Sequence, residues 1–158
     1  MIFARLVAAS FASLLSTASA VGQDSNFSTK DAMLENLFWT AQSYHLAERP
    51  YNLLSDCSLV MHLTANMLFN DEELKSERTA LKFMGLSGLF REASAIHIAQ
   101  TGKIDFPASA FQEVVMQKIS DDAAVMELAT NRLEECKIAL RDSSEKVGAD
   151  STSSGSNQ

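Results

Sequence analysis

Apolar residues recur at steps of three and four along most of this chain, and this spacing restricts the possible fold more than any other feature. Such spacing is typical of an α-helix with one buried face. No stretch alternates apolar and polar residues as a strand with one exposed face does. The sequence therefore predicts an all-α fold, an antiparallel bundle of four to five helices, with the helical domain over residues 28–142.

The first helix is expected to begin after Ser28, which suits an N-cap with Asp31 as the acid three residues further on. Pro50 ends this helix or bends it within a turn. Apolar residues recur along it with the helical period, and we expect the resulting stripe to face the core. The stripe comprises Leu34, Leu37, Phe38, Ala41 and Tyr44.

The second and third helices are expected over residues 51–69 and 71–101. Asn70 and Glu73 have the spacing of a capping box, which predicts the start of the third helix. Gly102 suits the position just after its last residue, where the backbone commonly turns left-handed. The two helices would therefore follow one another with almost no connection.

The third helix is apolar on two sides, which is the pattern of a helix at the centre of a bundle. Gly85 and Gly88 lie on one of these faces, and each costs about 1 kcal/mol relative to Ala in a helix interior. We expect a neighbouring helix to approach closely there; the alternative is a local weak point or kink. Further on, Pro107 suits the first turn of a fourth helix, and residues 120–122 predict a break or kink before the last one.

The first 20 residues have the pattern of a cleaved secretory signal peptide. Arg5 supplies the positive charge, an apolar run extends to about Leu15, and residues 18–20 form an A-x-A cleavage site. This run is too short to span a bilayer, which takes roughly 20 apolar residues, and no later stretch is long and apolar enough. We therefore expect a periplasmic or secreted protein; Asn26 would begin a glycosylation sequon only in a eukaryotic secretory pathway.

The two cysteines, Cys57 and Cys136, are expected to form a disulfide, because an isolated pair in an exported protein is most simply a structural crosslink. The alternatives are a thiol redox pair and a metal site, but neither cysteine lies in a C-x-x-C motif. The bond would join the second helix to the last one. It would close a loop of about 80 residues and stabilise the fold by on the order of 4–5 kcal/mol in the chain-entropy model.

Both ends of the mature chain are expected to lack regular structure. Residues 21–27 resemble a loose N-terminus, and residues 143–158 are rich in serine and glycine without an apolar period. Cleavage leaves 138 of the 158 residues, and the loss of Arg5 changes the formal charge from −7 to −8. This acidity argues against nucleic acid as a partner, because neutralising phosphates requires a surplus of Lys and Arg. It favours a basic protein partner instead.

The sequence carries no catalytic motif. It has no G-x-S-x-G, no H-E-x-x-H and no C-x-x-C-H for haem attachment, so we assign no catalytic residue and no cofactor. An enzyme with dispersed carboxylates remains an alternative, in which Glu92 would matter if it were buried. We expect Glu92 to pair instead with one of three arginines, namely Arg78, Arg91 or Arg132.

Histidines and methionines are the candidate metal ligands. His45 falls on the stripe of the first helix and His97 follows an apolar face of the third, where we expect both to pack. Met61, His62 and Met67 are soft or borderline ligands of a kind that binds Cu(I), although Met61 and His62 point to different sides of their helix. A small-ligand or metal carrier in the periplasm, for haem or copper, is therefore the alternative hypothesis.

Trp39 lies about 100° around the first helix from Phe38, away from the stripe of that helix, with Leu46 on its side. A second apolar patch either packs between two neighbours or is presented to a partner. Trp is enriched at energetic hot spots, and Tyr51 would border the same region. The leading hypothesis is an exported, non-enzymatic helical module of the inhibitor, immunity or adaptor type. Its candidate contacts with a protein partner are Trp39, Leu46 and Tyr51, and the sequence indicates no oligomeric state.

Overall fold

The computed structural model of the chain describes residues 29–70, 76–103, 105–116 and 122–153. Within these ranges the protein is all-α, which confirms the predicted fold class. The helices are α2 (Thr29–Leu46), α3 (Tyr51–Asn70), α4 (Glu77–Thr101), α5 (Ala110–Met116) and α6 (Asp122–Ser153). The expected signal peptide, the expected loose N-terminus and Ser28 lie outside the described residues.

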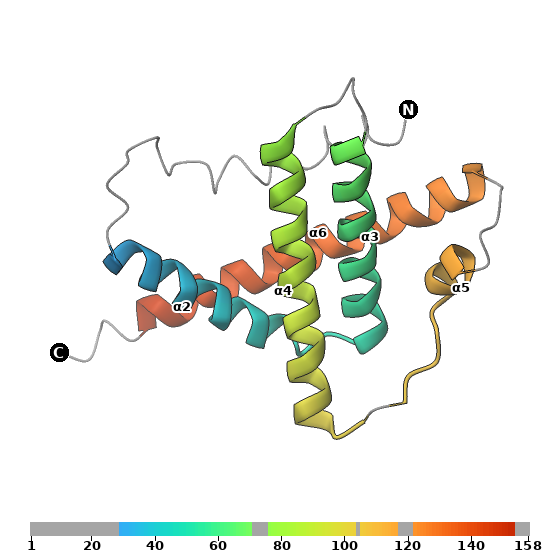
Figure 1. Cartoon of the computed structure of the whole chain (residues 1–158). Coiled ribbons are helices and arrows are strands. Elements are labelled where there is room, and N and C mark those ends of the chain that lie inside the picture. The colour runs from blue at the N-terminus through green and yellow to red at the C-terminus, as the bar shows by residue number, and fades with distance from the viewer. Residues whose placement is uncertain (1–28, 71–75, 104, 117–121, 154–158) are drawn as a thin grey trace.

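Two antiparallel pairs of helices cross one another (Figure 1). α3 and α4 stand side by side, while α2 runs antiparallel to the C-terminal part of the long α6. α5 lies near the other end of α6. Because α3 packs on α6 and α2 packs on both α4 and α6, the core lies where the two pairs cross. Among the described residues, no helix has an apolar stretch long enough to cross a membrane.

The predicted disulfide lies in the middle of this core. Cys57 on α3 and Cys136 on α6 are bonded with a Cα–Cα distance of 5.6 Å, and neither residue has exposed surface. The bond ties one helix pair to the other, as expected for the second and the last helix. The largest fully buried apolar side chains around it are Phe83, Phe90, Leu46, Leu54, Met61 and Leu68.

The start of α4 differs from the prediction. Asn70 is the last residue of α3, and its Nδ2 donates to the carbonyl of Asn66 one turn earlier. Ser76 is the N-cap of α4, because its Oγ accepts a hydrogen bond from the backbone N–H of Thr79. The predicted capping residue Glu73 lies outside the described residues. The predicted end is confirmed: Gly102 is left-handed, with φ of 66°, and its N–H donates to Ile98.

α5 is shorter than the fourth helix predicted from Pro107. Its N-cap is Ser109, whose Oγ accepts from the backbone N–H of Gln112 at 3.1 Å, while Oε1 of Gln112 accepts from the N–H of Ser109 at 3.4 Å. This reciprocal pair is a capping box of the S-x-x-Q type. The expected break at residues 120–122 falls largely in a segment outside the described residues, between the end of α5 and the start of α6.

α6 continues to Ser153, so the prediction that residues 143–158 are disordered is wrong for residues 143–153. The reason is that α2 packs along this extension. Ser143 and Val147 are buried against it, and Asp150 Oδ2 lies 3.0 Å from Nε2 of His45. A polar sequence remains helical here because tertiary contacts override its composition.

Candidate protein-binding surface

The apolar stripe of α2 faces solvent, which is the opposite of the prediction that it packs in the core. Leu37 is 64% exposed and Tyr44 is 54% exposed, whereas Gln42 and Ser43 are buried. We call the exposed residues the α2 outer stripe. It consists of Met33, Leu34, Leu37, Phe38 and Tyr44.

Hydrogen bonds explain why polar side chains of α2 point inward. Nε2 of Gln42 lies within donating distance of three acceptors on α6: the carbonyl of Leu140 at 3.2 Å and the Oγ atoms of Ser143 and Ser144 at 3.1 and 2.8 Å. Oγ of Ser43 donates to the carbonyl of Trp39 at 3.0 Å. Because these buried groups have partners, their burial carries little penalty. The helix is thereby held with its apolar side outward.

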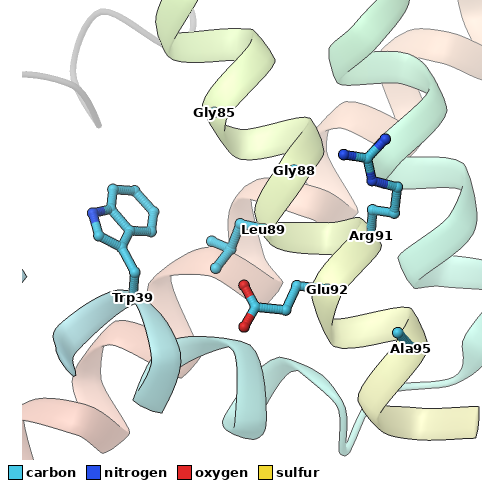
Figure 2. Close-up of a pocket in the computed structure, with 7 residues that line it drawn as sticks. All are labelled: Trp39, Gly85, Gly88, Leu89, Arg91, Glu92 and Ala95. Carbon is cyan, nitrogen blue, oxygen red and sulfur yellow. The ribbon is translucent and has the colours of Figure 1, made fainter. Parts of the chain in front are cut away.

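Trp39 forms one wall of an open groove of about 580 Å³ between α2 and α4 (Figure 2). Its side chain is half-buried, packs partly against the core, and donates from Nε1 to Oε1 of Glu35 at 3.4 Å. The rings of Trp39 and Phe38 are nearly perpendicular, with planes at 84° and centroids 6.3 Å apart. We call this hollow the α4 groove. Its lining residues are Trp39, Gly85, Gly88, Leu89, Arg91, Glu92 and Ala95.

Gly85 and Gly88 leave an open stretch along the α4 groove. A Cβ atom added at either glycine meets no atom within 4 Å. We predicted that a neighbouring helix approaches these glycines, but no helix in the described part of this chain does so. The same side of α4 also carries Leu81, which is 63% exposed, and Met84, which is 38% exposed. In the part of the chain that the structure describes, α4 is therefore packed on one side only, and the prediction of a helix surrounded by packing is corrected.

Two residues of opposite charge, Arg91 and Glu92, line the α4 groove. Arg91 and Glu92 are exposed, and neither makes an ion pair with any residue that the structure describes. The expected pairing of Glu92 with an arginine is therefore not found, and its exposure removes the reason to treat it as a buried catalytic acid. Arg132 instead lies beside Asp56 and Glu135.

Of the three predicted partner contacts, only Trp39 lines the α4 groove. Leu46 has no exposed surface and belongs to the core, so it is not available to a partner. Tyr51 stacks on Phe106, with centroids 3.9 Å apart and planes at 15°, beside the ring of His97. The ring of Tyr51 is therefore engaged within the chain.

The candidate copper ligands are not brought together. Met61 is fully buried in the core, while His62 is exposed and Met67 is 38% exposed on the same helix. In the described ranges, no group of three or more His, Cys, Asp or Glu side chains is placed to hold a metal ion.

Asp56 is a buried carboxylate with no exposed surface, and no motif in the sequence singles it out. Its Oδ1 accepts from Oγ of Ser109 at 2.6 Å, and Nε of Arg132 lies 3.0 Å from Oδ2 at ion-pair distance without the alignment of a hydrogen bond. Burial raises the pKa of Asp56, while the Ser109 hydrogen bond and the Arg132 charge oppose this rise. Since Asp56 itself has no surface that a substrate could reach, we interpret this cluster as structural: it joins α5 and α6 to α3. The S-x-x-Q spacing of Ser109 and Gln112 is the signal that predicts half of it.

Comparisons with protein-family models, with curated proteins and with solved structures find no match for this chain.

Proposed function

We propose that this protein is an exported, non-enzymatic helical module that acts by binding another polypeptide, in the manner of an inhibitor, immunity or adaptor protein. The binding surface is the α4 groove, with the α2 outer stripe as its neighbour on the adjoining helix. The observation that carries this proposal is the inverted orientation of α2. An apolar stripe left in water while polar side chains are buried is costly unless something covers it.

The α4 groove supplies the features that a docked helix requires. Trp39 offers a large, partly fixed aromatic surface of the kind found at energetic hot spots. Gly85 and Gly88 remove side chains from the floor, so that a partner backbone or a large apolar side chain has room to enter. Arg91 and Glu92 place charged groups at the border of the α4 groove, as in the polar rim that surrounds the apolar centre of a protein interface.

Two features that are typical of exported proteins support the same proposal. The N-terminal sequence has the signal-peptide pattern, and the buried disulfide suits an oxidising compartment. We therefore propose that the protein acts in the periplasm or outside the cell. There the crosslink stabilises the fold while the surface of α2 and α4 remains free for a partner.

Site-specific photocrosslinking in cells tests the proposal. A benzophenone amino acid at Leu81, on the grooved side of α4, is expected to give one discrete product with a second polypeptide. The matched control is the same amino acid at Ile138 on α6, which is 46% exposed and belongs to neither surface. Trp39→Ala is expected to reduce the Leu81 product while the helical circular dichroism is retained. Equal crosslinking at both positions, or none at Leu81, would contradict the proposal.

A further inference from the structure

We infer that a second copy of this chain fills the α4 groove, with the two α4 helices antiparallel across a two-fold axis. The inference rests on the proposed function, because it names the polypeptide that this same surface binds. It follows from the exposed apolar area, the spacing along α4 and the charges that α4 carries.

The outer side of α4 leaves large apolar side chains in water. Leu81 is 63% exposed and Met84 is 38% exposed, beside the open positions of Gly85 and Gly88. Covering these side chains with a second copy is favourable, because apolar surface leaves water on both copies at once.

The outer side of α4 has the spacing of a helix-packing seam. Residues on it follow one another at alternating steps of four and three, which is the period by which two helices interlock. Each of them is exposed or half-exposed in this chain, so the seam has no partner in the described residues. The seam comprises Glu77, Leu81, Met84, Gly88, Arg91 and Ala95.

A two-fold axis makes this seam complementary to itself. In the antiparallel register that sets Met84 opposite Gly88 of the second copy, symmetry repeats the same contact on the other side of the axis. The long Met84 side chain then enters the space that the glycine leaves open. The same register sets Leu81 against the aliphatic stem of Arg91, so each large apolar residue meets a glycine or an alkyl chain.

The charges on α4 favour a second copy over a basic partner. α4 carries the cations Arg78, Lys82 and Arg91 and the acids Glu77 and Glu92. Its formal charge is therefore slightly positive, although the whole chain is acidic. A basic partner would meet a helix with more cations than acids. In the antiparallel register, Glu92 lies between the positions of Arg78 and Lys82 of the second copy, where opposite charges attract.

Sedimentation equilibrium of the mature, disulfide-bonded protein from about 1 µM to about 300 µM tests this inference. We expect a dimer that dissociates on dilution, and Gly88→Leu is expected to raise its Kd at least about tenfold. The matched control is Gly148→Leu on α6, at a second helical glycine whose Cβ position meets nothing within 4 Å. Its Kd should equal that of the parent protein. A charge swap adds a second test: Arg78→Glu weakens the dimer, and Arg78→Glu with Glu92→Arg restores it.

A monomer at every concentration, or a dimer that Gly88→Leu and Gly148→Leu affect equally, overturns the inference. The photocrosslink at Leu81 then separates it from the proposed function. A product of twice the protein's own mass supports the second copy. A product with a different protein overturns the second copy while the proposed function stands, and the absence of any product overturns both.

Discussion

Replacing Gly88 by Ala is expected to stabilise the monomer, although glycines inside a helix are usually suspected of a packing role. Gly88 lies in the middle of the 25-residue helix α4, and a Cβ atom there meets nothing within 4 Å. The added methyl group therefore causes no clash. What remains is the difference in helix propensity, which favours Ala by about 0.8–1 kcal/mol. The same reasoning gives a similar gain for Gly85.

Urea unfolding followed by circular dichroism measures this change. It should be done at a protein concentration of about 1 µM, so that self-association contributes little. With a slope of about 1–3 kcal/mol per molar urea for a protein of this size, the midpoint rises by on the order of 0.5 M. Gly148→Ala should give the same gain, while Gly102→Ala should lose about 1 kcal/mol, because its φ of 66° is left-handed.

A loss of stability in Gly88→Ala, with the usual gain in Gly148→Ala, would refute this reasoning. It would mean that some part of the chain packs against Gly88 in solution. The α4 groove would then be filled from within, and the basis for placing a partner there would be gone.

Three further predictions concern the fold. Replacing both Cys57 and Cys136 by Ala should lower the free energy of unfolding by about 4–5 kcal/mol, because the bond closes a loop between residues 79 apart; a loss below about 1 kcal/mol in urea would contradict it. Truncation after Asp142 should cost about 3 kcal/mol, because a buried amide loses two acceptors and a buried valine is removed; truncation after Ser153 is the control and should leave the melting temperature unchanged. Burial raises the pKa of Asp56 above its ordinary 3.8, so the folded protein keeps this proton to higher pH than the unfolded chain and loses stability as the pH rises from 3.8 through the raised value. Asp56→Asn should abolish this fall, and an unchanged pH profile of stability would refute the assignment.

The presence of the helices could be predicted from the sequence, because it depends on the spacing of apolar residues within a few turns. The boundaries of α3 and the left-handed Gly102 follow from patterns within a few residues. The disulfide between Cys57 and Cys136 follows from the compartment that the signal-peptide pattern predicts. These features need no knowledge of which helices are neighbours. The same is true of the all-α fold class.

The orientation of α2 was not predictable in this way. Periodicity identifies an apolar side, but it does not tell whether that side meets the core or a partner. Gln42 determines which side of α2 faces the core, because its amide lies within hydrogen-bond distance of acceptors on α6 that are about a hundred residues away in sequence. The helical extension of α6 has the same cause, since α2 packs along its polar sequence and buries Ser143 and Val147.

The candidate surface was predicted in part. Trp39 was recognised as standing off the main stripe, and it does line the α4 groove. Leu46 shares its side of the helix but lies about two turns further along α2, where it is fully buried. The glycines of α4 were recognised as unusual. Their openness depends on the absence of a neighbouring helix among the described residues, which only the tertiary structure reveals.

Trp39 is the only tryptophan of the chain and lines the α4 groove, so its fluorescence tests the central claim most directly. If a second copy covers the groove, the emission maximum of the parent protein should move to shorter wavelength as the concentration rises, because the indole leaves water. Gly88→Leu should shift this transition to higher concentration, in proportion to its weaker dimerisation. An emission maximum that stays constant with concentration in both proteins, while sedimentation detects a dimer, would show that the copies meet elsewhere and would contradict the account.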